Sequence, residues 1–124
     1  MELLVVRRGK EPAKGTLDLP GGFVDMDETG EEGIIREIWE ETGLHVPAVD
    51  YLFSIPNLYM YSGMEIHTLD MFYQVQVEAG AEARAADDAA ETMWIPLSDV
   101  HAECFGLHSI RQAVSRFISS PYPQ

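Results

Sequence analysis

Hydrophobic positions along the chain fall into short runs and alternating stretches that predict strands. Glu2–Arg8 holds four consecutive aliphatic residues, which is typical of a buried strand. Leu69–Val77 alternates apolar and polar side chains, so we expect a half-buried strand there. Further strands are predicted over Leu17–Val24, where a glycine turn interrupts the run, and over Val46–Ser54 and Thr92–Leu97.

Two segments carry the signals of helices. Thr29-Gly-Glu-Glu32 has the form of a capping box, in which Thr29 and Glu32 each satisfy the other's free backbone amide. The helix that follows is predicted from about Gly30 to Thr42, with Gly43 as its left-handed cap. A second, amphipathic helix is predicted over Gly106–Ser119.

The remaining segments are expected to be loops. Ser54–Gly63 is rich in proline, asparagine and tyrosine, and Glu78–Glu91 is acidic and alanine-rich without clear periodicity. Strands and helices are therefore interspersed along the chain. This order predicts an α/β fold, with a mixed β-sheet covered by helices on both faces.

Length and charge narrow the class of protein. The chain has 124 residues, which predicts a single domain over residues 1–124. Its 21 acidic and 8 basic side chains give a net charge of −13, which argues against nucleic acid or a membrane as partner. A phosphate substrate remains compatible, because a bound metal reverses the local field. The single cysteine, Cys104, allows no internal disulfide and favours the cytoplasm.

Three glutamates on the first predicted helix point to metal chemistry. Glu37, Glu40 and Glu41 stand at i, i+3 and i+4, so they share one helix face. Carboxylates at this spacing, next to the negative end of a helix, oppose helix formation. A divalent cation removes this cost, and magnesium prefers such oxygen ligands. The alternative is a solvated acidic face in a glutamate-rich chain.

The same segment resembles a known motif. Residues 22–44 match the Nudix box at every defined position, and those positions are Gly22, Glu28, Arg36, Glu37, Ile38, Glu40, Glu41, Gly43 and Leu44. The resemblance implies a Nudix-type α/β/α sandwich. It also implies hydrolysis of the diphosphate linkage in a nucleoside diphosphate derivative.

The resemblance further implies roles for matching residues. Glu37, Glu40 and Glu41 are expected to bind Mg²⁺ or Mn²⁺, together with the main-chain carbonyl of Gly21. Family members differ in whether the residue matching Glu37 or a later loop carboxylate deprotonates water. Arg36 is expected to steady the box by pairing with Glu28 or neighbouring carboxylates. An ordinary i, i+4 pair between Arg36 and Glu32 is the alternative.

A later carboxylate often completes the site in this family. Asp87, Asp88 and Glu91 precede the last strand. We rank Glu91 first, because it lies nearest the strand and its position is the best fixed. A solvated loop charge is the alternative for each of the three.

Candidate substrate contacts come from three places. Arg7 and Arg8 are positioned to bind phosphate, with solvated strand-end charges as the alternative, and Gly22 lets the backbone approach phosphate closely. Ser54, Pro56 and Ser62 keep part of a motif of NADH pyrophosphatases, and Tyr59 falls where an aromatic could stack on a base. An ordinary loop is the alternative. NADH, ADP-ribose, other nucleotide sugars and nucleoside triphosphates all stay open as substrates.

Two further hypotheses concern the first strand and a non-catalytic role. The usual first strand of the family is expected to be absent ahead of Glu2–Arg8, and a homodimer that supplies a strand is an open possibility. A Nudix-like domain that only senses a nucleotide sugar is the alternative to an enzyme. Such domains typically lose box glutamates, and this chain keeps them, so the enzyme is favoured.

Overall fold

A computed structural model describes residues 2–77, 81–85 and 89–119 of the chain. The strands and helices, in chain order, are β1 (Glu2–Arg8), β2 (Leu17–Asp18), α1 (Gly30–Thr42), β3 (Asp50–Tyr61), β4 (Met64–Gln74), β5 (Ala89–Pro96) and α2 (His108–Ser119). Two short 3₁₀ turns, η1 (Leu97–Asp99) and η2 (Ala102–Cys104), separate β5 from α2. No helix among these residues is long and apolar enough to cross a membrane.

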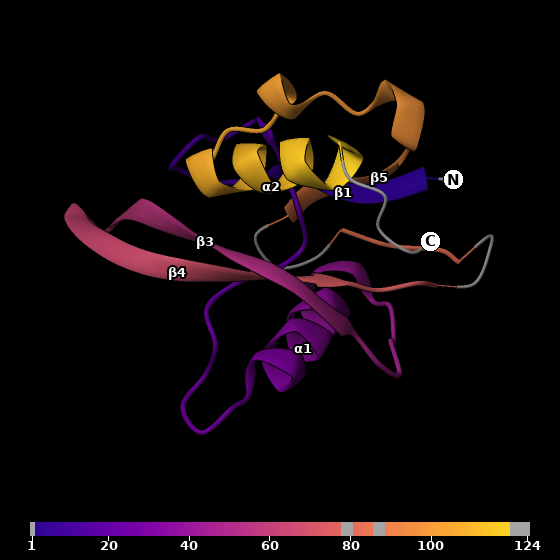
Figure 1. Cartoon of the computed structure of the whole chain (residues 1–124), viewed down its shortest axis with the longest axis horizontal. Helices are drawn as coiled ribbons and strands as arrows, with labels where there is room; N and C mark the ends of the chain where they lie inside the picture. The colour runs from indigo at the N-terminus through magenta and orange to yellow at the C-terminus, as the bar shows by residue number, and fades with distance from the viewer. Residues whose placement is uncertain (1, 78–80, 86–88, 120–124) are drawn as a thin grey trace.

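The strands form two antiparallel sheets. One has the order β2-β1-β5, and the other is the hairpin β3–β4. The single mixed sheet expected from the sequence is therefore wrong in this detail, since parallel pairing among the described residues is limited to one bridge between Leu17 and Phe105. The α/β architecture is confirmed: the hairpin crosses the middle of the molecule with α1 on one side and α2 on the other (Figure 1).

Buried aliphatic side chains hold these layers together. Val5 in β1 is fully buried and packs with Val100, Phe105 and Val114. The apolar face of α1 contributes Ile38 to a second cluster, and β3 contributes Phe53 to a third. Each fully buried side chain of this size contributes about 1.5–3 kcal/mol. The clusters fix α1 and α2 against the sheets, so the loops between them are carried on a rigid frame.

The ends of α1 are as the sequence predicts. The Glu32 amide donates to Thr29 Oγ1 at 3.1 Å, and the Thr29 amide donates to Glu32 Oε1 at 2.9 Å, which completes the capping box. Gly43 ends the helix with a φ of 75°, a left-handed conformation that glycine adopts without strain. The predicted bounds, Gly30 to Thr42, are confirmed.

The segment Ser54–Gly63 is not the loop that the sequence suggested. β3 continues through it to Tyr61, and β4 begins at Met64. Ser62 and Gly63 form the turn with φ values of 50° and 78°, the positive values that a two-residue hairpin turn requires. Proline lacks a backbone N–H, so Pro56 fits in β3 at a position that needs no donated hydrogen bond. The sequence does not reveal the strand by polarity, because polar Asn57 is buried and apolar Leu58 is exposed.

Other boundaries shift by a few residues. β5 begins at Ala89, inside the expected acidic loop, and α2 begins two residues later than predicted. On the apolar side of the predicted alternation, Leu69 and Met71 are 66% and 47% exposed, whereas Val75 and Val77 pack against the cluster that contains Ile38. On the other face, Asp70 reaches Ser109 of α2. The strand predicted over Leu69–Val77 is present, but it begins at Met64 and ends at Gln74, and its apolar side is buried only in part.

Candidate active site

The last turn of α1 is joined to the glycine turn that follows β2. The Gly21 amide donates a hydrogen bond of 2.7 Å to Glu41 Oε1. Glu41 is only 9% exposed, because its side chain lies between the last turn of α1 and the glycine turn. The turn and the helix are therefore held together by one of the three predicted metal-binding glutamates.

Gly22 lies directly against a second of these glutamates. A Cβ atom added at Gly22 would collide with the carboxylate of Glu37. Only glycine leaves room for this carboxylate beside the backbone. The space beside Gly22 is occupied by a glutamate oxygen of this chain, and the approach to phosphate predicted at Gly22 stays a prediction.

Arg36 connects the carboxylates of the box. Its guanidinium donates to Glu28 at 2.8 and 3.0 Å, to Glu37 at 2.6 Å and to Glu40 at 3.1 Å. It also reaches the Phe23 carbonyl at 3.1 Å. The predicted pair with Glu28 is present, whereas Glu32, the alternative partner, is engaged in the capping box. These carboxylates, Glu28 first, raise the pKa of Arg36 above its ordinary value, so the guanidinium stays charged.

The three glutamates do not converge on one point. Among the residues that the structure describes, no group of three or more His, Cys, Asp or Glu side chains is arranged to hold a metal ion. Glu37 and Glu40 face Arg36, and Glu41 faces the Gly21 amide. The donor set nevertheless consists of carboxylates beside a backbone turn, which is the chemistry that Mg²⁺ and Mn²⁺ select. Metal binding by these side chains requires them to exchange those partners.

Two predicted site residues turn out to be each other's partners. Arg7 and Glu91 face one another across β1 and β5, and Arg7 Nε lies 2.5 Å from Glu91 Oε1. Their side chains are 38% and 51% exposed. Asp87 and Asp88, the alternatives to Glu91, lie outside the described residues.

Arg8 occupies an internal position. Its Nη1 donates to Asp18 Oδ2 at 2.7 Å, its Nε to the Pro12 carbonyl at 2.6 Å, and its Nη2 to the Tyr59 hydroxyl at 3.4 Å. The Arg8 and Asp18 side chains are 11% and 15% exposed. Burial raises the pKa of the Asp18 carboxyl, although the Arg8 hydrogen bond opposes this. The phosphate contact predicted for Arg8 stays a prediction, and the structure adds a role in tying β1 to β3.

Aromatic side chains gather beside the glycine turn. The Phe23 ring meets Tyr59 edge-on at 5.7 Å between centroids and meets Tyr61 in the same way at 5.9 Å. Sequence reasoning selected Tyr59 but missed Phe23 and Tyr61. The position of Phe23, immediately after Gly22, was the available signal.

A polar group between the hairpin and α2 was also missed. Ser109, fully buried, donates to Asp70 Oδ2 at 2.5 Å, and Thr68 donates to Asp70 Oδ1 at 2.7 Å. Asn57 is 9% exposed and lies opposite Thr68 in the hairpin. The negative charge of Asp70 is close enough to Asp18 to raise the pKa of the Asp18 carboxyl further. No motif marks these residues, because they come from β2, the hairpin β3–β4 and α2, which are spread along the chain.

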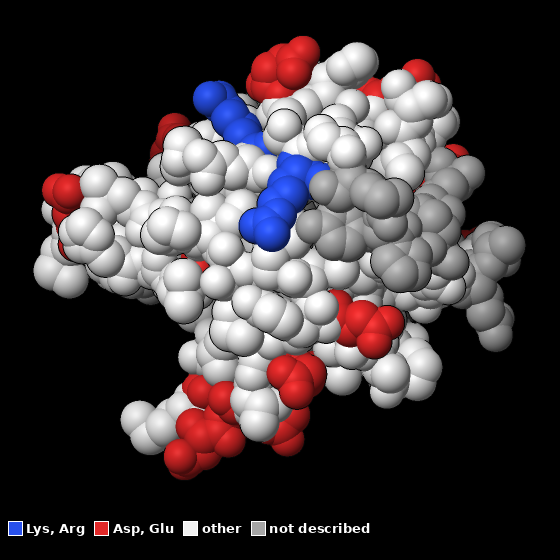
Figure 2. All heavy atoms as spheres, in the orientation of Figure 1, with Lys and Arg blue, Asp and Glu red and all other residues white. Residues whose placement is uncertain are grey.

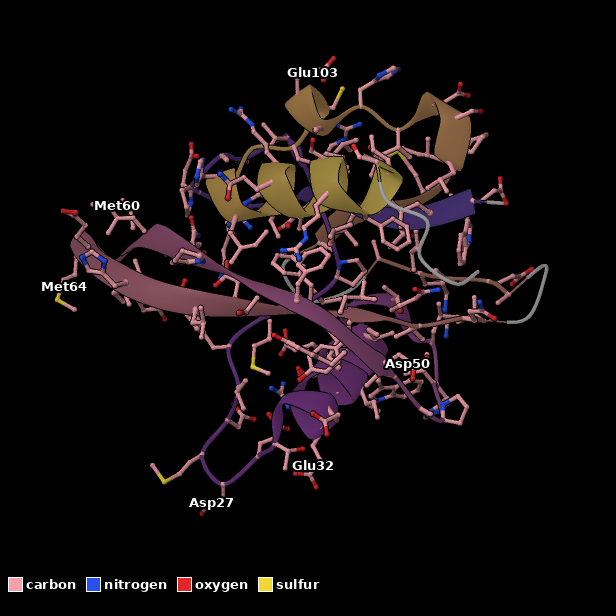
Figure 3. All side chains as sticks on the ribbon, in the orientation of Figure 1. Asp27, Glu32, Asp50, Met60, Met64 and Glu103 are labelled. Atoms are coloured by element: carbon pink, nitrogen blue, oxygen red, sulfur yellow. The ribbon has the colours of Figure 1, made fainter. Side chains whose placement is uncertain are left out.

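One continuous cleft of about 1570 Å³ joins these features. Its lining includes Gly22, Glu37 and Glu41 at one part and Asn57, Thr68 and Asp70 at another, with Tyr59 also on the wall. Acidic atoms gather over α1 and the loop before it, while basic atoms in the same view lie toward α2 (Figure 2). Asp27 and Glu32 project away from the hairpin tip that carries Met60 and Met64 (Figure 3).

Comparison with known proteins identifies the family. Residues 1–116 match the NUDIX domain, so the chain belongs to the NUDIX family. The resemblance inferred from the box is confirmed.

Curated relatives include two that align over most of this chain. An ADP-ribose pyrophosphatase of Methanocaldococcus jannaschii is 37% identical over 103 residues, which are 80% of this chain and 57% of that protein. A MutT-like protein of Streptomyces ambofaciens is 31% identical over 88% of this chain and 64% of its own length. The chain therefore spans about three fifths of the length of these relatives.

Solved structures share the fold. The NUDIX domain of Shewanella oneidensis NrtR, complexed with ADP ribose, superposes with a TM-score of 0.73 at 23% identity, covering 95% of this chain and 76% of that one. A bifunctional NMN adenylyltransferase/ADP ribose pyrophosphatase of Francisella tularensis, complexed with AMP and a Mn ion, gives 0.72 at 27% identity, covering 95% of this chain and 37% of that one. The first, at 23% identity, shows the fold alone, and the second is a similar structure that contains AMP and a Mn ion.

Proposed function

We propose that this chain hydrolyses the diphosphate linkage of a nucleoside diphosphate derivative with the help of a divalent cation. The observation that carries the proposal is the attachment of the box glutamates to the glycine turn. Glu41 accepts from the Gly21 amide at 2.7 Å, and Glu37 fills the space beside Gly22. Carboxylates and exposed backbone are thereby placed together on the wall of a cleft.

The cation is expected to be Mg²⁺, with Mn²⁺ as a substitute. Glu37, Glu40, Glu41 and the Gly21 carbonyl would hold it. Such an ion neutralises diphosphate oxygens and lowers the pKa of bound water. Arg36 is expected to keep Glu28 and the glycine loop in place, through its contacts with Glu28 and the Phe23 carbonyl.

Glu37 is a better candidate than Glu91 for accepting the proton of the attacking water. Glu37 lies against the glycine turn, and its side chain is 17% exposed. Glu91 is half exposed and paired with Arg7. Both carboxylates are paired with an arginine, Glu37 with Arg36 and Glu91 with Arg7, so the difference between them is their place. Glu37 lines the cleft beside the glycine turn, where a carboxylate is positioned for proton transfer.

Adenine diphosphates are the first substrates to test, with ADP-ribose ahead of NADH. The relative with 37% identity is named an ADP-ribose pyrophosphatase, which supports this order. The partner is therefore a small nucleotide-linked molecule. The net charge of −13 supports our prediction of no nucleic acid and no membrane partner. A homodimer and a cytoplasmic location stay predictions from the sequence.

A sensor of nucleotide sugars is the second candidate. The observation that favours it is the pairing of Glu37 and Glu40 with Arg36, which competes with metal binding. A sensor would bind ADP-ribose without turning it over.

The experiment is a substrate panel. The purified protein is incubated with Mg²⁺ and with ADP-ribose, NADH, a diadenosine polyphosphate or a nucleoside triphosphate, and products are separated by chromatography. Release of AMP from ADP-ribose, abolished by EDTA, is the expected result. Binding of ADP-ribose without any product would favour the sensor, and neither binding nor product would contradict both functions.

A further inference from the structure

Asn57 is a buried polar residue that has no assigned role. It is 9% exposed, and every fully buried side-chain nitrogen and oxygen among the described residues has a hydrogen-bond partner, so Asn57 is not a buried amide left unsatisfied. It lies on the wall of the cleft. A side-chain amide on a cleft wall can donate and accept hydrogen bonds with a ligand in the cleft.

The neighbours of Asn57 are mainly hydrogen-bond acceptors. Thr68 lies directly opposite Asn57 in the hairpin, and its hydroxyl donates a hydrogen bond of 2.7 Å to Asp70 Oδ1. Asp70 and Asp18 line the same cleft, and each carboxylate oxygen accepts one hydrogen bond from the protein. A carboxylate oxygen has capacity for a second. This part of the cleft therefore favours a ligand group that donates protons.

Asn57 is also one step along the strand from the aromatic side chains. Tyr59 is on the same face of β3, about 7 Å further on at the usual strand rise. Phe23 contacts Tyr59 and directly follows Gly22 at the glycine turn. A flat ring stacked on these aromatics would present its edge to Asn57, with its phosphates toward the glutamates.

We propose that Asn57 reads the base of the nucleotide and, with Asp18 and Asp70, selects adenine over guanine or hypoxanthine. This inference rests on the proposed function and names the substrate class of the same cleft. Adenine presents an amino group beside a ring nitrogen, and an asparagine amide pairs with both. Guanine and hypoxanthine present an oxygen in place of that amino group.

The carboxylates are needed for this choice. An asparagine amide on its own can rotate to pair with either kind of purine, because it carries one donor side and one acceptor side. Asp18 and Asp70 cannot rotate into donors while they are ionised. They accept the remaining proton of the adenine amino group and repel the oxygen of the other purines.

The first arm of the test measures hydrolysis of two substrates that differ only at this position, ADP-ribose and its hypoxanthine analogue. The wild type is expected to prefer ADP-ribose in kcat/KM by at least about fivefold. Asn57→Leu is expected to bring the ratio close to one. Leu58→Ser is the matched control: Leu58 is the next residue, faces the other side of β3 and is 49% exposed, so the ratio should stay at its wild-type value.

The second arm needs no turnover. AMP and IMP are titrated calorimetrically into wild type, Asn57→Leu and Asn57→Ser in EDTA, after thermal melts show which variants fold. The smaller Asn57→Ser serves if the leucine variant does not fold. Tighter binding of AMP than IMP, lost with the Asn57 side chain, supports base reading even if the protein proves not to hydrolyse anything. Equal binding of the two, a ratio that Asn57 variants leave unchanged, or no binding of either at millimolar concentration would overturn it.

Discussion

Glu41, in the last turn of α1, accepts the backbone amide of Gly21 at 2.7 Å. These residues are twenty positions apart, and the bond closes the box into a compact loop and helix. A carboxylate at the negative end of a helix is unfavourable unless a donor faces it. The Gly21 amide is such a donor, and it explains in part how a nearly buried glutamate is tolerated here.

The contact between Gly22 and Glu37 leads to a prediction for Gly22→Ala. The added methyl group must displace the Glu37 carboxylate, and displacement of a catalytic group by 1 Å can cost about 100-fold in rate. Turnover is therefore expected to fall by about one to two orders of magnitude. The melting temperature should change little, because the end of a flexible side chain yields. Initial rates and thermal melts measure both effects.

Gly30→Ala is the matched control for this substitution. A Cβ at Gly30 also collides with the end of a side chain, the Tyr73 hydroxyl, but this hydroxyl is bonded to Glu31 and not to the box carboxylates. Turnover close to wild type is expected. Equal losses in the two variants would mean that the rate responds to any steric change near α1.

The buried pair between Arg8 and Asp18 predicts a large effect on stability. Arg8→Met leaves the Asp18 carboxylate without its partner, which typically costs about 3–5 kcal/mol. The double variant Arg8→Met/Asp18→Leu should recover part of this, because no lone charge remains. Urea unfolding of the wild type, Arg8→Met and the double variant gives the comparison. A loss below about 1 kcal/mol in Arg8→Met, together with a raised KM, would instead assign Arg8 to phosphate binding.

The exposed pair between Arg7 and Glu91 predicts the opposite pattern. Such surface pairs contribute about 0–1 kcal/mol, so Glu91→Gln should barely change the free energy of unfolding. If Glu37 is the proton acceptor, the variant should also keep kcat within a few-fold of wild type. A fall of several orders of magnitude in kcat would transfer the catalytic role to Glu91.

Glu28 predicts a dependence of stability on pH. Hydrogen bonds from Arg36 hold the pKa of this carboxyl below its usual 4.5 in the folded state. The ionised Glu28 carboxylate therefore stabilises the folded state fully at pH values above its pKa in the unfolded chain. This stabilisation is lost as pH falls through its pKa in the folded state. Glu28→Gln should be less stable than wild type at pH 7, and the difference should shrink in acid.

Urea unfolding in EDTA at several pH values measures this difference. The raised pKa of Asp18 changes stability with pH in the opposite direction. Asp18 is present in both proteins, so its effect cancels in the difference between them. A difference that is constant from pH 7 to below pH 4.5 would show that the Glu28 charge is not what stabilises the loop.

Local signals predicted α1 and both of its ends well. The capping box at Thr29 and the cap at Gly43 depend only on neighbouring residues, so the sequence specifies them directly. The helix in turn fixes which glutamates share a face. Arg36 and Glu28 are eight residues apart within the same motif, and their pairing followed from the resemblance.

Long-range relationships were not accessible in this way. The Arg8 and Asp18 pair depends on antiparallel pairing of β1 with the two-residue strand β2, which no periodicity reveals. The hairpin was missed because Pro56 and Asn57 read as loop residues, while Ser62-Gly63 was not recognised as its turn. Asn57 became a candidate only when β3 placed it beside Tyr59 on the cleft wall.

The most direct test of metal-dependent hydrolysis by the box glutamates compares wild type with Glu41→Gln. Release of AMP from ADP-ribose is measured for both, with Mg²⁺ and at equal protein concentration. We expect Mg²⁺-dependent release by the wild type and a loss of orders of magnitude in a folded Glu41→Gln variant, because the amide side chain removes a metal-binding charge. Wild-type turnover in Glu41→Gln would contradict the assignment of the box glutamates to the metal and the chemistry.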